Sequence, residues 1–298
     1  MSEAVSAEDS QTQTVQPRER RLAGFWRRFK RNKLAVVGLV IVAIMLLTAA
    51  LAPVIAPSDP QAQDYGLTLQ PPGEGGLMGT DSLGGDVFSR VVFGARISLY
   101  SSLISVGLAL LVGVPVGLTS GYFRGIWDEW IVMRVVDSLQ AFPFLILALV
   151  IAAILGGGLG YAMIAIGIGF ISAFVRITRA QVLTVRSLDY VDAARAIGTG
   201  HTGIMIRHIL PNSLPPLLVQ TTLAVGYAII AEATLSFLGL GAEPGQPSWG
   251  SMLFQAQSYL TTAWWMAFFP GMAIFFAVLG FNLLGDGVRE ALDPRTYD

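Results

Sequence analysis

Six long apolar stretches constrain this chain more than any other feature of its sequence. The first, at about 34–55, contains 22 residues without a charge from Leu34 to Ile55, which is about 33 Å of α-helix and enough to cross a hydrocarbon core of about 30 Å. The other five lie at about 97–120, 137–155, 161–177, 215–238 and 263–284. Hydrophobic residues make up 53% of the chain and charged residues 13%, which is too apolar for an ordinary soluble protein. The sequence therefore predicts an all-α, polytopic membrane protein with six transmembrane helices.

The basic residues predict how these helices are oriented. Of the 19 Lys and Arg, only Arg90 and Arg96 lie in segments placed outside. The other 17 lie before the first span, after the second and fourth spans, and at the C-terminus. Lys and Arg are in excess on the cytoplasmic side of membrane proteins. Both termini, and the polar loop 188–212, are therefore predicted to be cytoplasmic.

The N-terminal region divides into two parts by composition. Residues 1–20 are polar and lack apolar periodicity, which predicts a disordered cytoplasmic tail. Residues 21–33 place Phe25, Trp26 and Phe29 among basic residues, a pattern typical of a helix in the headgroup region. Residues 34–298 are then expected to form the transmembrane domain.

The residues needed for catalysis are not found in recognisable patterns. His201 and His208 stand seven apart without a metal-binding spacing, and the chain has no cysteine. It has two lysines, Lys30 and Lys33, and no Gly-x-x-x-x-Gly-Lys motif that would hold ATP phosphates. We therefore expect no enzyme activity, metal site or cofactor in this chain. Energy for active transport would come from a partner or an ion gradient.

A few polar residues interrupt the apolar stretches. Glu232 is the one clear acid in the core of a predicted span, and burying it unpaired would be costly. Arg96, at similar depth, is its expected partner, and a structural ion pair is favoured over a substrate contact. Gln220 and Asn282 either line a path or bond neighbouring helices. Gly113, Gly117 and Gly121 allow another helix to approach closely.

The loop 188–212 is predicted to contain a short helix. Asp189 is expected to cap it, and Asp192 adds negative charge to its first turn. Gly198 supplies a natural end. Helical spacing gathers a small apolar face from Tyr190, Ala193, Ala194 and Ile197. An ordinary loop helix is the alternative interpretation.

Part of this loop, DAARAIGTGHTGIMIRHILP, resembles the cytoplasmic signature of ABC-importer permeases. The matching residues are Asp192, Ala193, Ala194, Gly198, Leu210 and Pro211. Asp192 replaces the usual glutamate, and His208 stands where many families have isoleucine. GTDSLGGDVFSRVVFGARISL, EATLSFLGLG, PSWGSML and FNLLGDGVREALDPR resemble the C-type subunit of dipeptide, oligopeptide and nickel importers. Gly85 departs from the arginine that is common there.

The resemblance implies a type I ABC-importer permease in a bacterial inner membrane, a non-catalytic subunit that contacts lipid and no nucleic acid. It implies a homologous second permease, two cytoplasmic ATPases that bind ATP and Mg, and an extracytoplasmic binding protein. The apolar face with Ala193, Ala194 and Ile197 would enter a groove on an ATPase. Peptides are the expected substrate, with nickel or another small solute as the alternative. A stand-alone ion-coupled transporter is a second alternative, and would need inverted repeats and more intramembrane charges.

Overall fold

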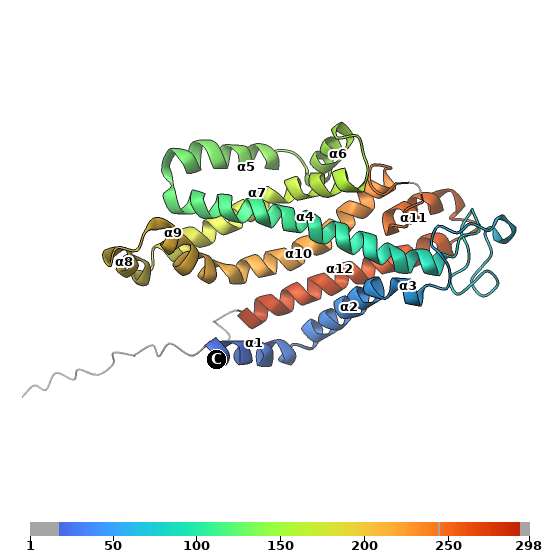
Figure 1. Ribbon diagram of the computed structural model, residues 1–298, viewed down its shortest axis with the longest axis horizontal. Coiled ribbons are helices and arrows are strands. Elements are labelled where there is room, and N and C mark those ends of the chain that lie inside the picture. Colours follow the sequence, from blue (N-terminus) through green and yellow to red (C-terminus); the bar gives the residue numbers. More distant parts are fainter. Residues whose placement is uncertain (1–17, 244, 293–298) are drawn as a thin grey trace, which may run out of the picture.

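The computed structural model describes residues 18–243 and 245–292, and every regular element in this part of the chain is helical. Figure 1 shows long helices packed side by side along one axis. The long elements are α1 (Arg18–Arg31), α2 (Lys33–Ala50), α4 (Val87–Phe123), α7 (Leu159–Arg186), α10 (Leu210–Phe237) and α12 (Trp265–Leu292). The shorter ones are α3 (Ala52–Ile55), η1 (Tyr65–Leu67), η2 (Trp127–Val132), α5 (Met133–Gln140), α6 (Phe144–Ile154), α8 (Asp189–Ala196), α9 (His201–Gly203), η3 (Ile204–Ile209), α11 (Trp249–Ala256) and η4 (Gln257–Tyr259).

Five continuous helices in the described chain are long and apolar enough to cross a membrane. They are α2, α4, α7, the run from α9 to α10 at His201–Phe237, and α12. The pair formed by η2–α5 and α6 brings the number to six if the two parts are counted as one span. The helical fold and the number of spans agree with the prediction from the apolar stretches.

The third span differs from its prediction. A single helix was expected over 137–155, but α5 and α6 meet at a bend of 94°. The break falls at residues 141–143, and Pro143 stands directly before α6. Proline disfavours helical backbone in the residue before it and has no N–H to donate, so the helix cannot run through. An apolar run alone does not show this bend.

Several other helices differ in extent from the predicted spans. α4 begins at Val87, ten residues before the predicted start, because Asp86 accepts a hydrogen bond from the Ser89 N–H at 2.8 Å and caps the helix. α7 continues nine residues past the predicted end at residue 177. The first span, predicted over 34–55, is interrupted between α2 and α3 at Leu51. Helices need not end where the apolar stretch ends.

The N-terminal helix α1 lies against the end of α12. Its Phe29 packs in a buried cluster with Ala35 of α2 and Ala291 of α12. Asn32 caps α2 by accepting from the Ala35 N–H at 3.0 Å, and its amide donates to Glu290 at 2.5 Å. Residues 1–17 of the predicted tail lie outside the described residues. Residues 18–20, also assigned to the tail, form the first turn of α1.

Glycines bring α4 and α7 into close contact, as predicted. A Cβ on Gly113 would lie 2.6 Å from the Phe174 Cβ. One on Gly117 would lie 2.6 Å from the Val175 carbonyl oxygen. Those distances are too short for any larger residue, so the two backbones touch along this line.

Gly117→Ala is therefore expected to destabilise the protein by about 1–3 kcal/mol, because the added methyl group must push α7 away. Gly107→Ala is the matched control on the same helix, since a Cβ there would meet nothing within 4 Å. The control is expected to be neutral or to stabilise by up to about 1 kcal/mol. Thermal unfolding of both variants in detergent checks this. Equal melting temperatures would contradict the proposed close packing.

Candidate functional site

The loop 188–212 folds into a structure that we call the coupling segment, made of α8, α9 and η3. Its start differs from the prediction: Leu188 occupies the N-cap position without a side-chain hydrogen bond, and Asp189 is the first helical residue. Asp189 therefore contributes charge to the first turn and does not cap it. Asp192 is exposed and forms an ion pair with Arg195 at 2.7 Å.

The two sides of α8 have different surroundings. Val191 and Ala194 are buried, with exposed fractions of 0% and 4%. Ala193 is exposed, and Ile197 is 83% exposed. Ala193 and Ile197 of the predicted apolar face are thus exposed, whereas Ala194 faces the protein's own interior and is not part of an exposed face.

The buried side of α8 joins a compact apolar cluster. This cluster contains Leu118, Tyr122, Val182, Val185, Val191, Ile204, Met205 and Ile209, with the half-buried Leu210 packed against it. Its members come from α4, α7, α8, η3 and α10. The sequence did not predict that α4 takes part, because Leu118 and Tyr122 lie in an apolar run with no distinguishing pattern. The coupling segment is thus packed against three long helices.

The end of α8 is defined by Gly198. Its φ of +84° lies in the left-handed region that favours glycine. The Gly198 N–H donates to the Arg195 carbonyl at 2.9 Å, and the Thr199 N–H donates to the Ala194 carbonyl at 3.0 Å. This pair of bonds is a Schellman motif. It turns the chain sharply and leaves Ile197 projecting at the corner.

Tyr122, at the end of α4, connects that helix to the coupling segment. Its hydroxyl lies 2.8 Å from the His201 Nδ1 atom, so one of the two groups donates to the other. The Arg186 guanidinium donates to the Tyr122 carbonyl at 2.7 Å. Arg186 and Arg195 each lie 5.9 Å from the centre of the Tyr122 ring. These contacts fix the position of α9 relative to α4 and α7.

A second polar contact joins α8 to the start of α10. The Tyr190 hydroxyl donates to the His208 carbonyl at 3.2 Å. The Asn212 amide donates to the Tyr190 hydroxyl at 3.0 Å and to the His208 carbonyl at 2.7 Å. Partial burial raises the pKa of the Tyr190 phenol, so this group stays neutral and can donate. Pro211 is exposed near the start of α10, where the backbone needs no N–H donor.

Sequence reasoning missed an ion pair that fixes the turn after α4. Asp128 is fully buried, and both of its oxygens accept from Arg179 of α7 at 2.6 Å. Ser120 donates to the same carboxylate at 2.5 Å. The two charged residues are 51 positions apart, so only the fold brings them together. No local pattern singles the pair out, because Glu129 stands beside Asp128 and Arg176 lies three residues before Arg179.

Arg134 and Asp137 stand three residues apart, and this spacing alone predicts an ion pair between them. That pair does not form in the described chain. Asp137 instead pairs with Arg176 of α7 at 2.6 Å, with both side chains about half exposed. Arg134 lies 5.4 Å from the centre of the Trp130 ring, as a cation–π contact. Helical spacing allowed the predicted pair, but the neighbouring helix offers Asp137 a better-placed base.

Glu232 is fully buried, and its predicted pairing with Arg96 is wrong. Its two oxygens accept from Ser98 at 2.9 Å and from Ser236 at 2.8 Å. Arg96 precedes Ser98 by two residues and so lies about 200° away around α4. It is exposed, and no ion pair in the described part of the chain contains Arg96 or Glu232. Glu232 therefore joins α10 to α4 through hydroxyl groups.

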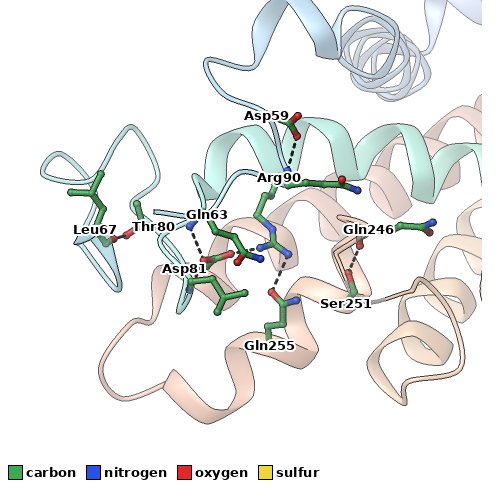
Figure 2. A network of polar contacts seen from close by, with 12 residues as sticks. Asp59, Gln63, Leu67, Thr80, Asp81, Arg90, Gln246, Ser251 and Gln255 are labelled. Carbon is green, nitrogen blue, oxygen red and sulfur yellow. Dashed lines mark hydrogen bonds and ion pairs between the residues drawn. The ribbon is translucent and has the colours of Figure 1, made fainter. Parts of the chain in front are cut away.

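The chain between α3 and α4, which we call the outer segment, is held by a network of polar contacts that Figure 2 shows. Asp81 accepts from the N–H groups of Leu83 and Gly85, each at 2.8 Å, and pairs with the buried Arg90. Arg90 also donates to Gln255 at 3.0 Å. Asp81 thus has a basic partner in Arg90, although residue 85 is a glycine.

The loop between α10 and α12, which we call the second outer loop, contains the short helix α11, which was not predicted. This helix also bonds to the outer end of α4. Ser248 and Ser251 form a capping box at its start. The Trp249 indole donates to the Val91 carbonyl of α4 at 3.0 Å. These bonds attach the loop between α10 and α12 to the outer end of α4.

Two clefts contain two of the predicted pathway residues, Arg96 and Gln220. The outer cleft, of about 640 Å³, is lined by Arg96, Asp59 and Phe93 among others. The inner cleft, of about 610 Å³, lies between α7, α10 and α12 and contains Gln220. Asn282 lines neither cleft. It lies where α10 meets α12, 3.5 Å from the position of a Cβ on Gly226. Within residues 18–243 and 245–292, no group of three or more His, Asp or Glu is arranged to hold a metal ion.

Comparison with protein families gives two matches. A family described as binding-protein-dependent transport system inner membrane component matches residues 113–297. The N-terminal TM domain of oligopeptide transport permease C matches residues 21–72. The two matches overlap neither in sequence nor in the helices they contain. The first covers more than half of the chain.

Several curated proteins are similar over nearly the whole length. A putative peptide transport system permease of Brucella abortus is 45% identical over 269 residues, covering 90% of each chain. The dipeptide transport system permease DppC of Alkalihalophilus pseudofirmus is 43% identical, covering 91% of this chain and 88% of that protein. The glutathione transport system permease GsiD of Pectobacterium atrosepticum is 42% identical, covering 91% and 90%.

Among solved structures, an inward-facing conformation of the MetNI methionine ABC transporter has the same fold. It aligns with a TM-score of 0.58 and 21% identity, covering 69% of this chain and 98% of that chain. Taken with the helical spans, the family and sequence matches show that the chain belongs to the binding-protein-dependent transport system inner membrane components, the multi-pass permeases of ABC importers.

Proposed function

We propose that this chain is one permease subunit of an importer for short peptides. It pairs with a homologous second permease, two cytoplasmic ATPases that bind ATP and Mg, and an extracytoplasmic binding protein. The names of its relatives, which include peptide, dipeptide and glutathione permeases, support this substrate class. The chain itself binds no nucleotide and catalyses no reaction in this proposal.

The observation that carries the proposal is the exposed corner of α8. Ile197 is 83% exposed at the end of a helix whose other side is fixed in an apolar cluster. Ala193, one turn earlier, is also exposed and is small enough to let another protein approach. A short helix with one apolar exposed face is suited to a groove on a partner. We assign that groove to the ATPase.

The orientation follows from the positions of the basic residues. α1, the coupling segment and the end of α12 lie at one end of the molecule, and the outer segment and α11 lie at the other (Figure 1). Most of the Lys and Arg belong to the first end, and such an excess is typical of the cytoplasmic side. In this proposal both termini are cytoplasmic.

The packing of the coupling segment indicates how force would pass from the ATPase. α8 contacts the inner ends of α4 and α7 through the apolar cluster, and its Tyr190 is bonded to Asn212 of α10. A displacement of α8 therefore moves three long helices together as rigid bodies.

Uptake by cells tests the substrate class. Deleting the gene is expected to abolish uptake of a labelled dipeptide, and supplying the gene again should restore it. Labelled nickel, measured in the same cells, addresses the alternative substrate. Unchanged dipeptide uptake together with lost nickel uptake would overturn the peptide assignment and leave the permease assignment intact.

A further inference from the structure

We propose that the inner cleft is a binding site for the C-terminal carboxylate of a transported peptide, and that its occupancy is transmitted to the coupling segment. This rests on the proposed function. The cleft is distinct from the coupling segment, and Asn212 of α10 lines the cleft while bonding Tyr190 of that segment. Its volume of about 610 Å³ lies within the range of about 300–1,000 Å³ typical of small-molecule sites.

Among the described residues that line it, the cleft offers one positive charge and no negative one. Arg289 of α12 lines it, and no Asp or Glu is among the lining residues. Arg289 is exposed and forms no ion pair in the described part of the chain. A guanidinium binds a carboxylate through two parallel N–H bonds. The charge of the site therefore favours an anionic group on the ligand.

The rest of the polar lining suits a peptide unit. Gln181 of α7 and Gln220 of α10 each present an amide, which can both donate and accept. A peptide bond offers the complementary N–H and C=O groups. Val219 and Leu223 supply apolar surface beside these amides, sufficient for an aliphatic side chain. A simple inorganic anion could accept from these amides but would leave their carbonyl oxygens and the apolar surface without a partner.

Two consecutive prolines add acceptors to the same place. Pro215 and Pro216 lie inside α10 and line the cleft. Because proline has no N–H, the carbonyls of Pro211 and Asn212 lose their usual donors four residues later. Pro211 and Asn212 are both exposed. Of the two, Asn212 lines the cleft, and its carbonyl can accept a hydrogen bond from the N–H or ammonium group of a short peptide.

Asn212 connects the cleft to the coupling segment. Its amide nitrogen donates to the Tyr190 hydroxyl at 3.0 Å and to the His208 carbonyl at 2.7 Å. Its Oδ1 atom accepts no hydrogen bond in the described part of the chain and is available to a ligand in the cleft. A peptide bound there changes the position of the side chain that fixes Tyr190 of α8. Peptide binding in the cleft would therefore change the position of α8, the helix proposed to contact the ATPase.

Equilibrium binding to the complete transporter tests the proposal. The complex is placed in nanodiscs without its binding protein, and labelled Ala-Ala is titrated with and without a C-terminal amide on the peptide. The wild type is expected to bind the free acid at least tenfold more tightly than the amide. Arg289→Gln should remove that difference, and Arg289→Lys should keep part of it. Arg27→Gln, an exposed arginine of α1 outside the cleft, is the matched control and should bind like the wild type.

The coupling is tested by the ATPase rate of the same complex. Ala-Ala is expected to change this rate at least twofold in the wild type, and Asn212→Ala should bind the peptide while losing the response. Absence of binding, equal affinity for acid and amide, or displacement of the peptide by anionic lipid would each overturn the proposal. Dipeptide uptake by cells remains the test of the proposed function, so the site can fail while that function stands.

Discussion

Replacing Ile197 by aspartate is expected to reduce uptake at least tenfold while the protein remains in the membrane. The exposed side chain of Ile197 would otherwise bury its apolar surface in the ATPase groove, which stabilises the contact by about 1.5–3 kcal/mol. Aspartate loses this contribution and adds the cost of an unpaired buried charge. Uptake of labelled dipeptide, normalised to the amount of permease in the membrane, measures the effect. Co-purification of the ATPase measures the lost contact directly.

Ile126→Asp is the matched control for this substitution. Ile126 is 74% exposed in the turn between α4 and η2, at the same end of the molecule but outside the coupling segment. The control should transport normally. If Ile197→Asp also transports normally, the corner of α8 is not the docking surface. Ala194 is a poor position for this test, because it is buried and a larger residue there would disturb folding.

Replacing Asp128 by alanine is expected to cost about 3–5 kcal/mol of stability, since it leaves Arg179 partly buried without its partner. Ser120 also loses the acceptor of its hydroxyl hydrogen bond. The measurement is thermal unfolding of the purified protein in detergent. We expect a large decrease in melting temperature and increased proteolysis in the turn after α4.

Asp137→Ala is the matched control, because it removes the same type of residue from an ion pair that is about half exposed. Pairs of this kind contribute about 0–1 kcal/mol. The double variant Asp128→Ala/Arg179→Leu should recover part of the lost stability, since it leaves no charge without a partner. If Asp128→Ala and Asp137→Ala have the same effect, the buried pair does not hold the turn.

The sequence predicted the features that depend on local pattern. Long uncharged runs identified the spans, and glycines at four-residue spacing identified the close contact of α4 with α7. Gly198 identified the end of α8 because few other residues accept its backbone geometry. Each of these depends on neighbouring positions in the chain and on elementary sterics.

The features that the sequence did not predict depend on which elements meet in space. Ala194 has helical spacing with Ala193 and Ile197, yet it is buried, because η3 packs against α8. Glu232 bonds two serines because α4 presents Ser98, and not Arg96, toward α10. Asp137 pairs with α7 and not with its own helix. Local spacing offers several partners in each case, and only the packing selects one.

The length of α4 has a consequence for communication across the membrane. This helix of 37 residues is about 55 Å long. Tyr122 near one end is bonded to His201 of the coupling segment, and Arg90 near the other is bonded to Asp81 and Gln255 of the outer loops. Its hydrogen bonding is interrupted only where Pro115 lacks an N–H. Suppose that nucleotide binding to a partner ATPase changes how tightly another protein binds the outer loops. Linkage then requires that binding of this protein changes the ATPase's affinity for nucleotide by the same free energy.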